Sequence, residues 1–114
     1  MTKAITRDDL RAAIAARDVV VLEALPQTYF EKEHLPGARN LPLEDIEKLA
    51  PKLIPRMDSA VVTYCVNAAC NNSAIAARRL EALGYVNVRK YPDGKQDWVE
   101  AGLPVEHGPA DATT

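Results

Sequence analysis

The stretch that most constrains the fold is residues 60–73, with the sequence AVVTYCVNAACNNS. Its first five residues form an apolar, β-branched run of the kind found in buried strands, and Cys65 follows directly. Seven mostly small or amide-bearing residues then lead to Ser73, where the pattern changes to that of a helix. The stretch therefore predicts a strand, a cysteine-bearing loop and a helix in succession.

The predicted helix covers residues 74–83. Ala76, Leu80 and Leu83 recur at spacings of four and three, so they share one helical face. Ser73 is a favourable N-cap, and Gly84 is a residue that commonly ends a helix.

The position of Cys65 favours a reactive sulfur. Ligands of open parallel sheets bind beyond the carboxyl ends of the strands, and the N-terminus of the following helix carries unpaired N–H groups that suit an anion. We therefore expect the pKa of a thiol or persulfide at Cys65 to be lowered. The alternative is that Cys65 is a free cysteine packed as one more apolar residue.

The other segments predict strands that alternate with helices. Further helices are expected at residues 7–16 with Thr6 as cap, at 26–32, from Pro42 onward and at 95–101, further strands at 19–22 and 86–88, and a linker at 52–54. Such alternation indicates an α/β fold with a parallel sheet and right-handed crossovers.

Length and composition are those of one small globular domain. The 114 residues carry a net charge of −2, so no basic surface points to nucleic acid, and no apolar run is long enough to span a membrane. Two cysteines without an export signal predict a cytoplasmic protein with free thiols. We expect the domain to cover residues 1–106 and residues 107–114 to form a flexible tail.

Four segments together carry a family resemblance: EHLPGARNLP, VVTYC, SAIAARRLEALGYVNV and YPDGKQDWVEAGLPVE. Their order and spacing resemble the rhodanese homology domain over residues 5–106. The chain is therefore similar to a single-domain rhodanese of the sulfurtransferase family. The resemblance implies a rhodanese-like three-layer α/β fold, in which helices flank a mostly parallel five-stranded sheet.

The resemblance also implies a thiosulfate sulfurtransferase mechanism. Cys65 would be the catalytic nucleophile that takes sulfur from a donor such as thiosulfate, becomes a persulfide, and passes the sulfur to cyanide or a cellular thiol. A sulfur-relay protein is a further candidate partner, and neither a metal ion nor an organic cofactor is implied. The implied substrate-binding residues, which would cradle the persulfide through backbone N–H groups, are Val66, Asn67, Ala68, Ala69, Cys70, Asn71, Asn72 and Ser73.

The loop is longer than is usual in the family. Ser73 follows Cys65 by eight positions instead of six, and the loop holds a second cysteine, Cys70. We expect Cys65 to be the nucleophile because it directly follows the strand, and we expect the two cysteines to be able to form a regulatory disulfide. An alternative function is therefore a rhodanese-fold module without turnover, which binds partners or senses redox state through Cys65 and Cys70.

The chain also departs from the family in charge. Asn71 and Asn72 stand where many members place a cation. The absence of that cation should weaken thiosulfate binding. Glu23 and Leu25 replace an aspartate and an arginine that often follow the second strand. The candidates to compensate for the missing loop cation are Arg39, Arg78 and Arg79.

Other chemistries are disfavoured. His34 belongs to a turn motif and is expected to make a structural hydrogen bond. A zinc site built from Cys65, Cys70, His34 and His107 is disfavoured by the spacing of the cysteines and by the position of His107 near the end of the chain. A phosphatase of this fold would need an arginine where Asn71 stands.

Overall fold

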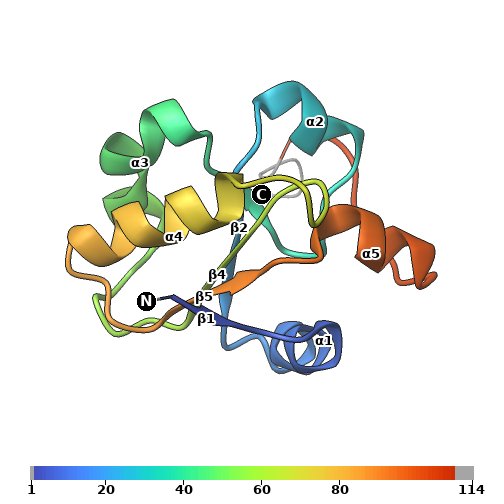
Figure 1. The fold of residues 1–114 in the computed structure, drawn as a ribbon, viewed down its shortest axis with the longest axis horizontal. Helices are drawn as coiled ribbons and strands as arrows, with labels where there is room; N and C mark the ends of the chain where they lie inside the picture. Colours follow the sequence, from blue (N-terminus) through green and yellow to red (C-terminus); the bar gives the residue numbers. More distant parts are fainter. Residues whose placement is uncertain (1, 110–114) are drawn as a thin grey trace.

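The computed structural model describes residues 2–109. Its elements are β1 (Lys3–Ala4), α1 (Arg7–Ala16), β2 (Val20–Glu23), α2 (Gln27–Lys32), β3 (Arg39–Asn40), η1 (Leu43–Asp45), α3 (Ile46–Leu53), β4 (Val61–Tyr64), α4 (Asn72–Ala82), β5 (Val88–Tyr91) and α5 (Gly94–Glu100). The strands form one sheet in the order β1-β5-β4-β2-β3, and every paired neighbour runs parallel (Figure 1). The predicted α/β fold with a five-stranded parallel sheet is confirmed.

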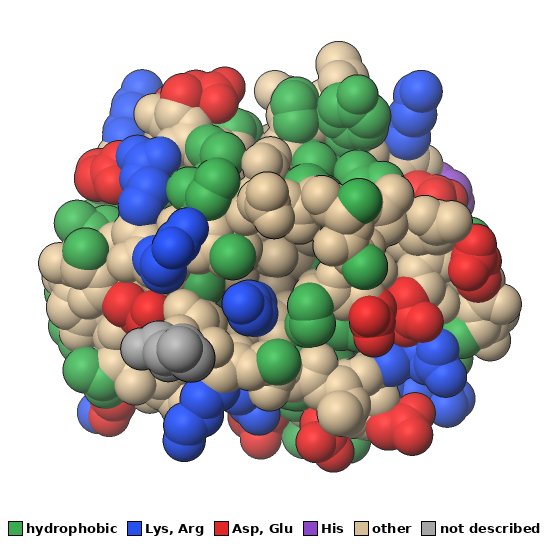
Figure 2. All heavy atoms as spheres, viewed as in Figure 1, with side chains coloured by type: hydrophobic (Ala, Val, Ile, Leu, Met, Phe, Trp, Pro, Cys, Tyr) green, Lys and Arg blue, Asp and Glu red, His purple; other side chains and the backbone are tan. Residues whose placement is uncertain are grey.

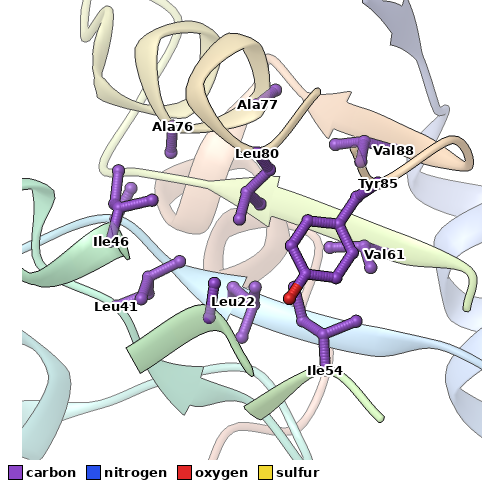
Figure 3. Close-up of a cluster of buried hydrophobic side chains, with 12 residues drawn as sticks. Leu22, Leu41, Ile46, Ile54, Val61, Ala76, Ala77, Leu80, Tyr85 and Val88 are labelled. Atoms are coloured by element: carbon purple, nitrogen blue, oxygen red, sulfur yellow. The ribbon is translucent and has the colours of Figure 1, made fainter. Parts of the chain in front are cut away.

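The central strand β4 separates two hydrophobic cores because its side chains alternate between the faces of the sheet. Val61 belongs to the core beneath α3 and α4, together with Leu80 and Tyr85 (Figure 3). Val62 and Tyr64 belong to the core on the other face, which α1, α2 and α5 cover. The sheet is therefore covered on both faces, as its continuous apolar strands require.

The same alternation directs the residue after β4. Thr63 shares the face of Val61, and its hydroxyl donates a hydrogen bond of 2.8 Å to the carbonyl oxygen of Ser73 in α4. Cys65 is two residues further on, so its side chain lies on the α4 side of the sheet. The fold thus brings the cysteine and the first turn of α4 together.

Two predicted helix ends are confirmed. Thr6 caps α1, since its hydroxyl accepts a hydrogen bond from the Asp9 N–H. Gly84 follows α4 with a φ of 108°, a conformation that favours glycine.

The prediction that Ser73 caps α4 is wrong. The helix begins at Asn72, and the cap position is Asn71, whose side chain makes no capping hydrogen bond. Ser73 is buried within the first turn. Its hydroxyl interacts with the Cys65 sulfur instead of with the helix backbone.

The predicted linker at 52–54 is also wrong, because α3 continues through Pro51 to Leu53. Ala50 and Ile54 anchor the last turn in the core, which offsets the backbone hydrogen bond that Pro51 cannot donate. The strand predicted at 86–88 instead begins at Val88, the residue that pairs with Val61.

Two residues of the expected flexible tail, His107 and Gly108, contact the chain at α2. The ring of His107 hydrogen bonds to the carbonyl oxygen of Lys32, and the Gly108 N–H donates to the carbonyl oxygen of Glu31. Both residues are thus held against α2. Residues 110–114 of the predicted tail lie outside the described residues.

Candidate functional site

Cys65 lies at the carboxyl end of β4 with only 1% of its surface exposed. Its Sγ donates a hydrogen bond to the carbonyl oxygen of Cys70, 3.3 Å away. The backbone N–H and the hydroxyl of Ser73, in the first turn of α4, also interact with the Cys65 sulfur. The sulfur is therefore enclosed between the strand end, the far side of its own loop and the start of a helix.

The prediction that the pKa of Cys65 is lowered is wrong. Burial raises the pKa of the Cys65 thiol above its ordinary value, and the neighbouring Cys70 side chain raises it further, whereas the Ser73 backbone N–H lowers it only in part. Desolvation of the thiolate outweighs the donors at the helix start, because the loop closes over the sulfur. The resting cysteine is thus held mainly as a thiol at neutral pH.

Asn67 organises the turn that carries Cys70. Its side-chain oxygen accepts a hydrogen bond of 3.0 Å from the Ala69 N–H, and its carbonyl oxygen accepts one of 3.1 Å from the Cys70 N–H. Two of the N–H groups expected to cradle sulfur are therefore used within the loop. Ala68 and Ala69 form the exposed tip of this turn.

The remaining predicted binding residues lie between the tip and the helix. Val66, Asn67, Cys70 and Asn72 are half-buried, Asn71 is exposed, and Ser73 is buried. The Asn72 side chain donates to the carbonyl oxygen of Ala24 at 2.9 Å and so ties the end of the loop to the end of β2. Of these eight residues, Cys70 and Ser73 interact with the Cys65 sulfur. The substrate-binding role of all eight stays a prediction.

Helix α5 holds the first half of the loop. The N–H groups of Lys95 and Gln96 each donate a 2.8 Å hydrogen bond, to the carbonyl oxygens of Cys65 and Val66 respectively. Gly94, with a φ of 74°, packs directly on this backbone: a Cβ there would lie 2.7 Å from the Asn67 nitrogen and 2.8 Å from the Cys65 carbonyl oxygen. Glycine is therefore required at 94 for both its conformation and its lack of a side chain.

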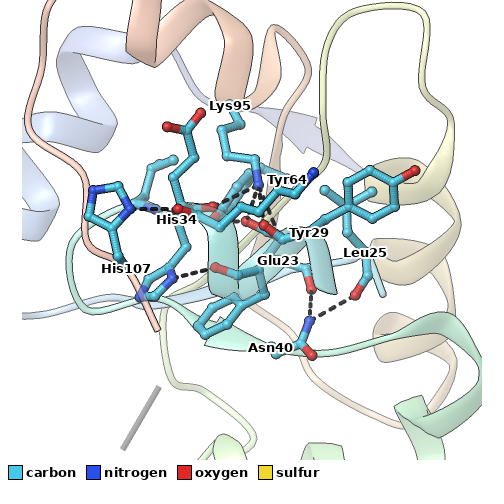
Figure 4. Close-up of polar contacts among 12 residues, drawn as sticks. Glu23, Leu25, Tyr29, His34, Asn40, Tyr64, Lys95 and His107 are labelled. Atoms are coloured by element: carbon cyan, nitrogen blue, oxygen red, sulfur yellow. Dashed lines mark hydrogen bonds and ion pairs between the residues drawn. The ribbon is translucent and has the colours of Figure 1, made fainter. Parts of the chain in front are cut away.

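A buried ionic network lies beneath the loop (Figure 4). Lys95 Nζ is 3.2 Å from the Glu23 carboxylate and also donates to the carbonyl oxygens of Tyr29 and Glu33, at 3.1 and 2.7 Å. The Tyr64 hydroxyl donates to Glu23 at 2.7 Å and accepts from the Leu35 N–H at 3.1 Å. Glu23 is fully buried and Lys95 nearly so, and each of their polar groups has a partner.

The network shifts the protonation of its members. Burial raises the pKa of Glu23, against the opposing effects of the Tyr64 hydroxyl and the Lys95 ammonium. Burial and the adjacent Glu23 carboxyl raise the pKa of Tyr64 well above its ordinary value, so the hydroxyl remains a donor. Glu23 stands out in the sequence, whereas Lys95 does not. An acidic residue next to a buried apolar strand needs a cation from elsewhere in the chain, and that need is the signal for Lys95.

The arginines considered as substitutes for a loop cation have other surroundings. Arg79 forms an ion pair with Glu47 of α3 and also donates to the carbonyl oxygen of Leu43. Arg78 is exposed on α4, and Arg39 lies in β3. Lys95 lines the same hollow as Val66 of the loop, but its ammonium is bonded to Glu23.

His34 makes a structural contact, as predicted. Its Nδ1 is hydrogen bonded to the carbonyl oxygen of Phe30 at 2.7 Å, and its ring stacks on the Phe30 ring with centroids 3.8 Å apart. Within residues 2–109, no group of three or more His, Cys, Asp or Glu side chains is arranged to hold a metal ion. None of the helices in that range has the length and apolar character needed to cross a membrane.

A hollow of about 310 Å³ opens beside the loop. It is lined by Val66 of the loop, Lys95, Gln96, Val99 and Glu100 of α5, and Glu33. The face of the molecule in Figure 2 carries acidic and basic side chains side by side, with apolar groups between them. The hollow borders the first half of the loop on its α5 side.

A family model and a related protein each match most of the chain. The family model for the rhodanese-like domain matches residues 6–101. The Mycobacterium tuberculosis protein named HTH-type transcriptional regulator Rv0324 is 32% identical over 105 residues, which are 92% of this chain and 45% of that protein. The chain thus spans less than half of that relative.

Solved structures share the fold. A thiosulfate sulfurtransferase from Pseudomonas aeruginosa matches with a TM-score of 0.83 and 30% identity, over 93% of this chain and 20% of that one. The human single-domain sulfurtransferase TSTD1 matches with a TM-score of 0.78 and 19% identity, over 88% of this chain and 97% of that one. At that identity, the human protein is similar in fold alone.

Proposed function

Because the chain belongs to the family of rhodanese-like domains, we propose that it is a sulfurtransferase that carries sulfane sulfur as a persulfide on Cys65. The observation that carries the proposal is the placement of this cysteine, at the end of the central strand and against the first turn of α4. A family match over residues 6–101 and the likeness to a thiosulfate sulfurtransferase support it.

The first half-reaction is an attack by the Cys65 thiolate on the outer sulfur of a donor. With thiosulfate, a bond forms between Cys65 Sγ and the outer sulfur, the sulfur–sulfur bond of thiosulfate breaks, and sulfite leaves with the electron pair. The N–H and hydroxyl of Ser73 are placed to stabilise negative charge on the cysteine sulfur. In the second half-reaction an acceptor thiolate or cyanide takes the outer sulfur, which returns Cys65 to the thiolate.

The charges around the loop favour donors other than thiosulfate. Asn71 and Asn72 supply no cation, and Lys95 is occupied by Glu23. Glu33 and Glu100 line the hollow beside the loop. These charges accommodate a dianion such as thiosulfate poorly. A low-mass persulfide or the persulfide of a sulfur-relay protein is therefore the better donor. The cytoplasm is a location that would supply donors of this kind.

Mass spectrometry tests the proposal directly. The reduced protein is treated with thiosulfate or with cysteine persulfide, separated by gel filtration and weighed. We expect an added mass of one sulfur on the wild type and none on Cys65→Ser, with Cys70→Ser still able to gain the sulfur. A sulfur that is retained by Cys65→Ser and lost in Cys70→Ser would place the nucleophile at Cys70.

A second candidate function is a rhodanese-fold module that binds or senses without turnover. The matching relative with a regulatory name and the raised pKa of the buried Cys65 favour this alternative. It predicts no persulfide with either donor. Thiosulfate:cyanide turnover that is measurable and is lost in Cys65→Ser would rule it out.

A further inference from the structure

The second cysteine lies against the first. The carbonyl oxygen of Cys70 accepts the hydrogen bond of Cys65 Sγ at 3.3 Å. A carbonyl oxygen is separated from its own Cα by two bonds, so the Cα of Cys70 lies within roughly 6 Å of Cys65 Sγ. A disulfide requires the two Cα atoms to lie within about 7 Å of each other, so the two sulfurs can meet if the short loop that joins the cysteines rearranges.

The part of the chain that would have to adjust is the exposed turn. Residues 68–71 belong to no helix or strand, and the turn is closed by the two hydrogen bonds to Asn67. The Cys65 backbone, in contrast, is held by α5 through the Lys95 N–H. Closure between the two sulfurs would therefore move Cys70 and leave the strand end in place.

The two cysteines also differ in how exposed they are. Cys65 is 1% exposed, so its sulfur is shielded from thiols in solution, whereas Cys70 is only half-buried. An external thiol has poor access to the inner sulfur of a persulfide on Cys65. Cys70 is already beside that atom, which gives it the high effective concentration of an intramolecular nucleophile.

We propose that Cys70 resolves the Cys65 persulfide and releases its outer sulfur as hydrosulfide. The inference rests on the proposed function, since it begins from the persulfide that function forms. The Cys70 thiolate attacks Cys65 Sγ, a bond forms between the two Sγ atoms, and the bond from Cys65 Sγ to the outer sulfur breaks. The outer sulfur leaves with the electron pair and its proton as HS⁻, so the sulfane sulfur is reduced while the two cysteines are oxidised to a disulfide.

The product disulfide links the half-buried Cys70 to the buried Cys65. A cellular dithiol, attacking at Cys70, returns both cysteines to thiols and allows another turnover. The protein would then convert a persulfide donor and a dithiol into hydrosulfide and a disulfide. In the absence of a dithiol it would stop after one turnover.

A single-turnover experiment without reductant tests this step. Wild type and Cys70→Ser are loaded with cysteine persulfide, freed of donor by anaerobic gel filtration, and followed by intact mass and by sulfide in the buffer. We expect the wild-type adduct to decay at least about tenfold faster, with one sulfide released and a final mass two hydrogens below that of the reduced protein. Peptide mapping should find the Cys65–Cys70 disulfide, while Cys70→Ser should keep its persulfide.

Three outcomes would overturn the inference, and one of them concerns the proposed function as well. Equal persulfide lifetimes in the two proteins, or sulfur recovered on Cys70 without a disulfide, would contradict resolution while leaving the Cys65 persulfide intact. No persulfide on either protein would contradict the proposed function and with it this step. Val86→Ser is the control, since it changes an exposed side chain outside the loop and should decay like the wild type.

Discussion

The two halves of the Cys65 loop are held in opposite ways. Its first half, Cys65 to Asn67, is pressed against α5 by two backbone hydrogen bonds and by the bare backbone of Gly94. Its second half, which ends at Asn71, is exposed and is closed by contacts to Asn67. The first half of the loop therefore fixes the position of the nucleophile, and the second half, which is more accessible, carries the second thiol.

The first half of the loop depends on charge as well as on packing. Lys95 supplies both the N–H that holds the Cys65 carbonyl oxygen and the ammonium that neutralises buried Glu23. A residue of α5 thus joins the loop to β2 and to the segment after α2. Damage to this residue should affect the whole molecule, whereas damage to the exposed turn should affect only the site.

The largest expected effect is that of Lys95→Met, which removes the partner of a fully buried carboxylate. We expect the free energy of unfolding at pH 7 to fall by about 3–5 kcal/mol, the usual cost of leaving a buried charge unpaired. Chemical denaturation measures this value. Lys32→Met, which changes an exposed lysine of α2, should have almost no effect.

The same variant has a predictable pH dependence. Burial already raises the pKa of Glu23, so folding favours its protonated form, and its ionisation costs stability as pH rises through that raised pKa. Without Lys95 the pKa should rise further. The stability deficit of Lys95→Met should therefore shrink as pH falls from 7 toward 5, and a deficit that is constant with pH would contradict the assignment of this network.

The next effect is that of Gly94→Ala, which places a Cβ against the fixed half of the loop. A positive φ alone costs about 1 kcal/mol, and the contacts below 3.0 Å should add at least as much because they fall on backbone atoms. Gly102→Ala is a matched control, since its φ of 77° is similar but nothing lies within 4 Å. Thermal unfolding of both variants, with persulfide yield beside it, should show a larger loss at Gly94 in both measurements.

What the sequence could predict follows from the range of the interactions. The strand, Cys65 and the helix were predictable because they are signalled by local periodicity, and Thr6 because a cap acts within three residues. The pairing of Glu23 with Lys95 spans 72 positions, so no local pattern announces it. The raised pKa of Cys65 was missed for a related reason, since burial of the sulfur depends on how the longer loop folds over it.

A smaller effect is expected in the exposed half of the loop. Asn67→Ala removes the side-chain oxygen that accepts the Ala69 N–H, at a cost of about 1 kcal/mol or less because the turn is solvated. The free energy of unfolding should hardly change. The rate of hydrosulfide release from the loaded protein should fall several-fold, because Cys70 is then held less well beside Cys65.

The smallest effect tests the electrostatics of the open turn. Asn71 is exposed and precedes α4, at the position where many rhodaneses carry a cation, so Asn71→Arg should lower the Michaelis constant for thiosulfate in thiosulfate:cyanide turnover. An exposed charge pair contributes up to about 1 kcal/mol, which corresponds to a decrease of up to roughly fivefold. Ala68→Arg adds the same charge at the tip of the turn and controls for general attraction of the dianion. An equal decrease in both variants would indicate attraction by net charge alone. No change or a rise in Asn71→Arg would mean that the missing cation does not limit thiosulfate binding. Closure of the loop over Cys65 would then be the feature that limits it.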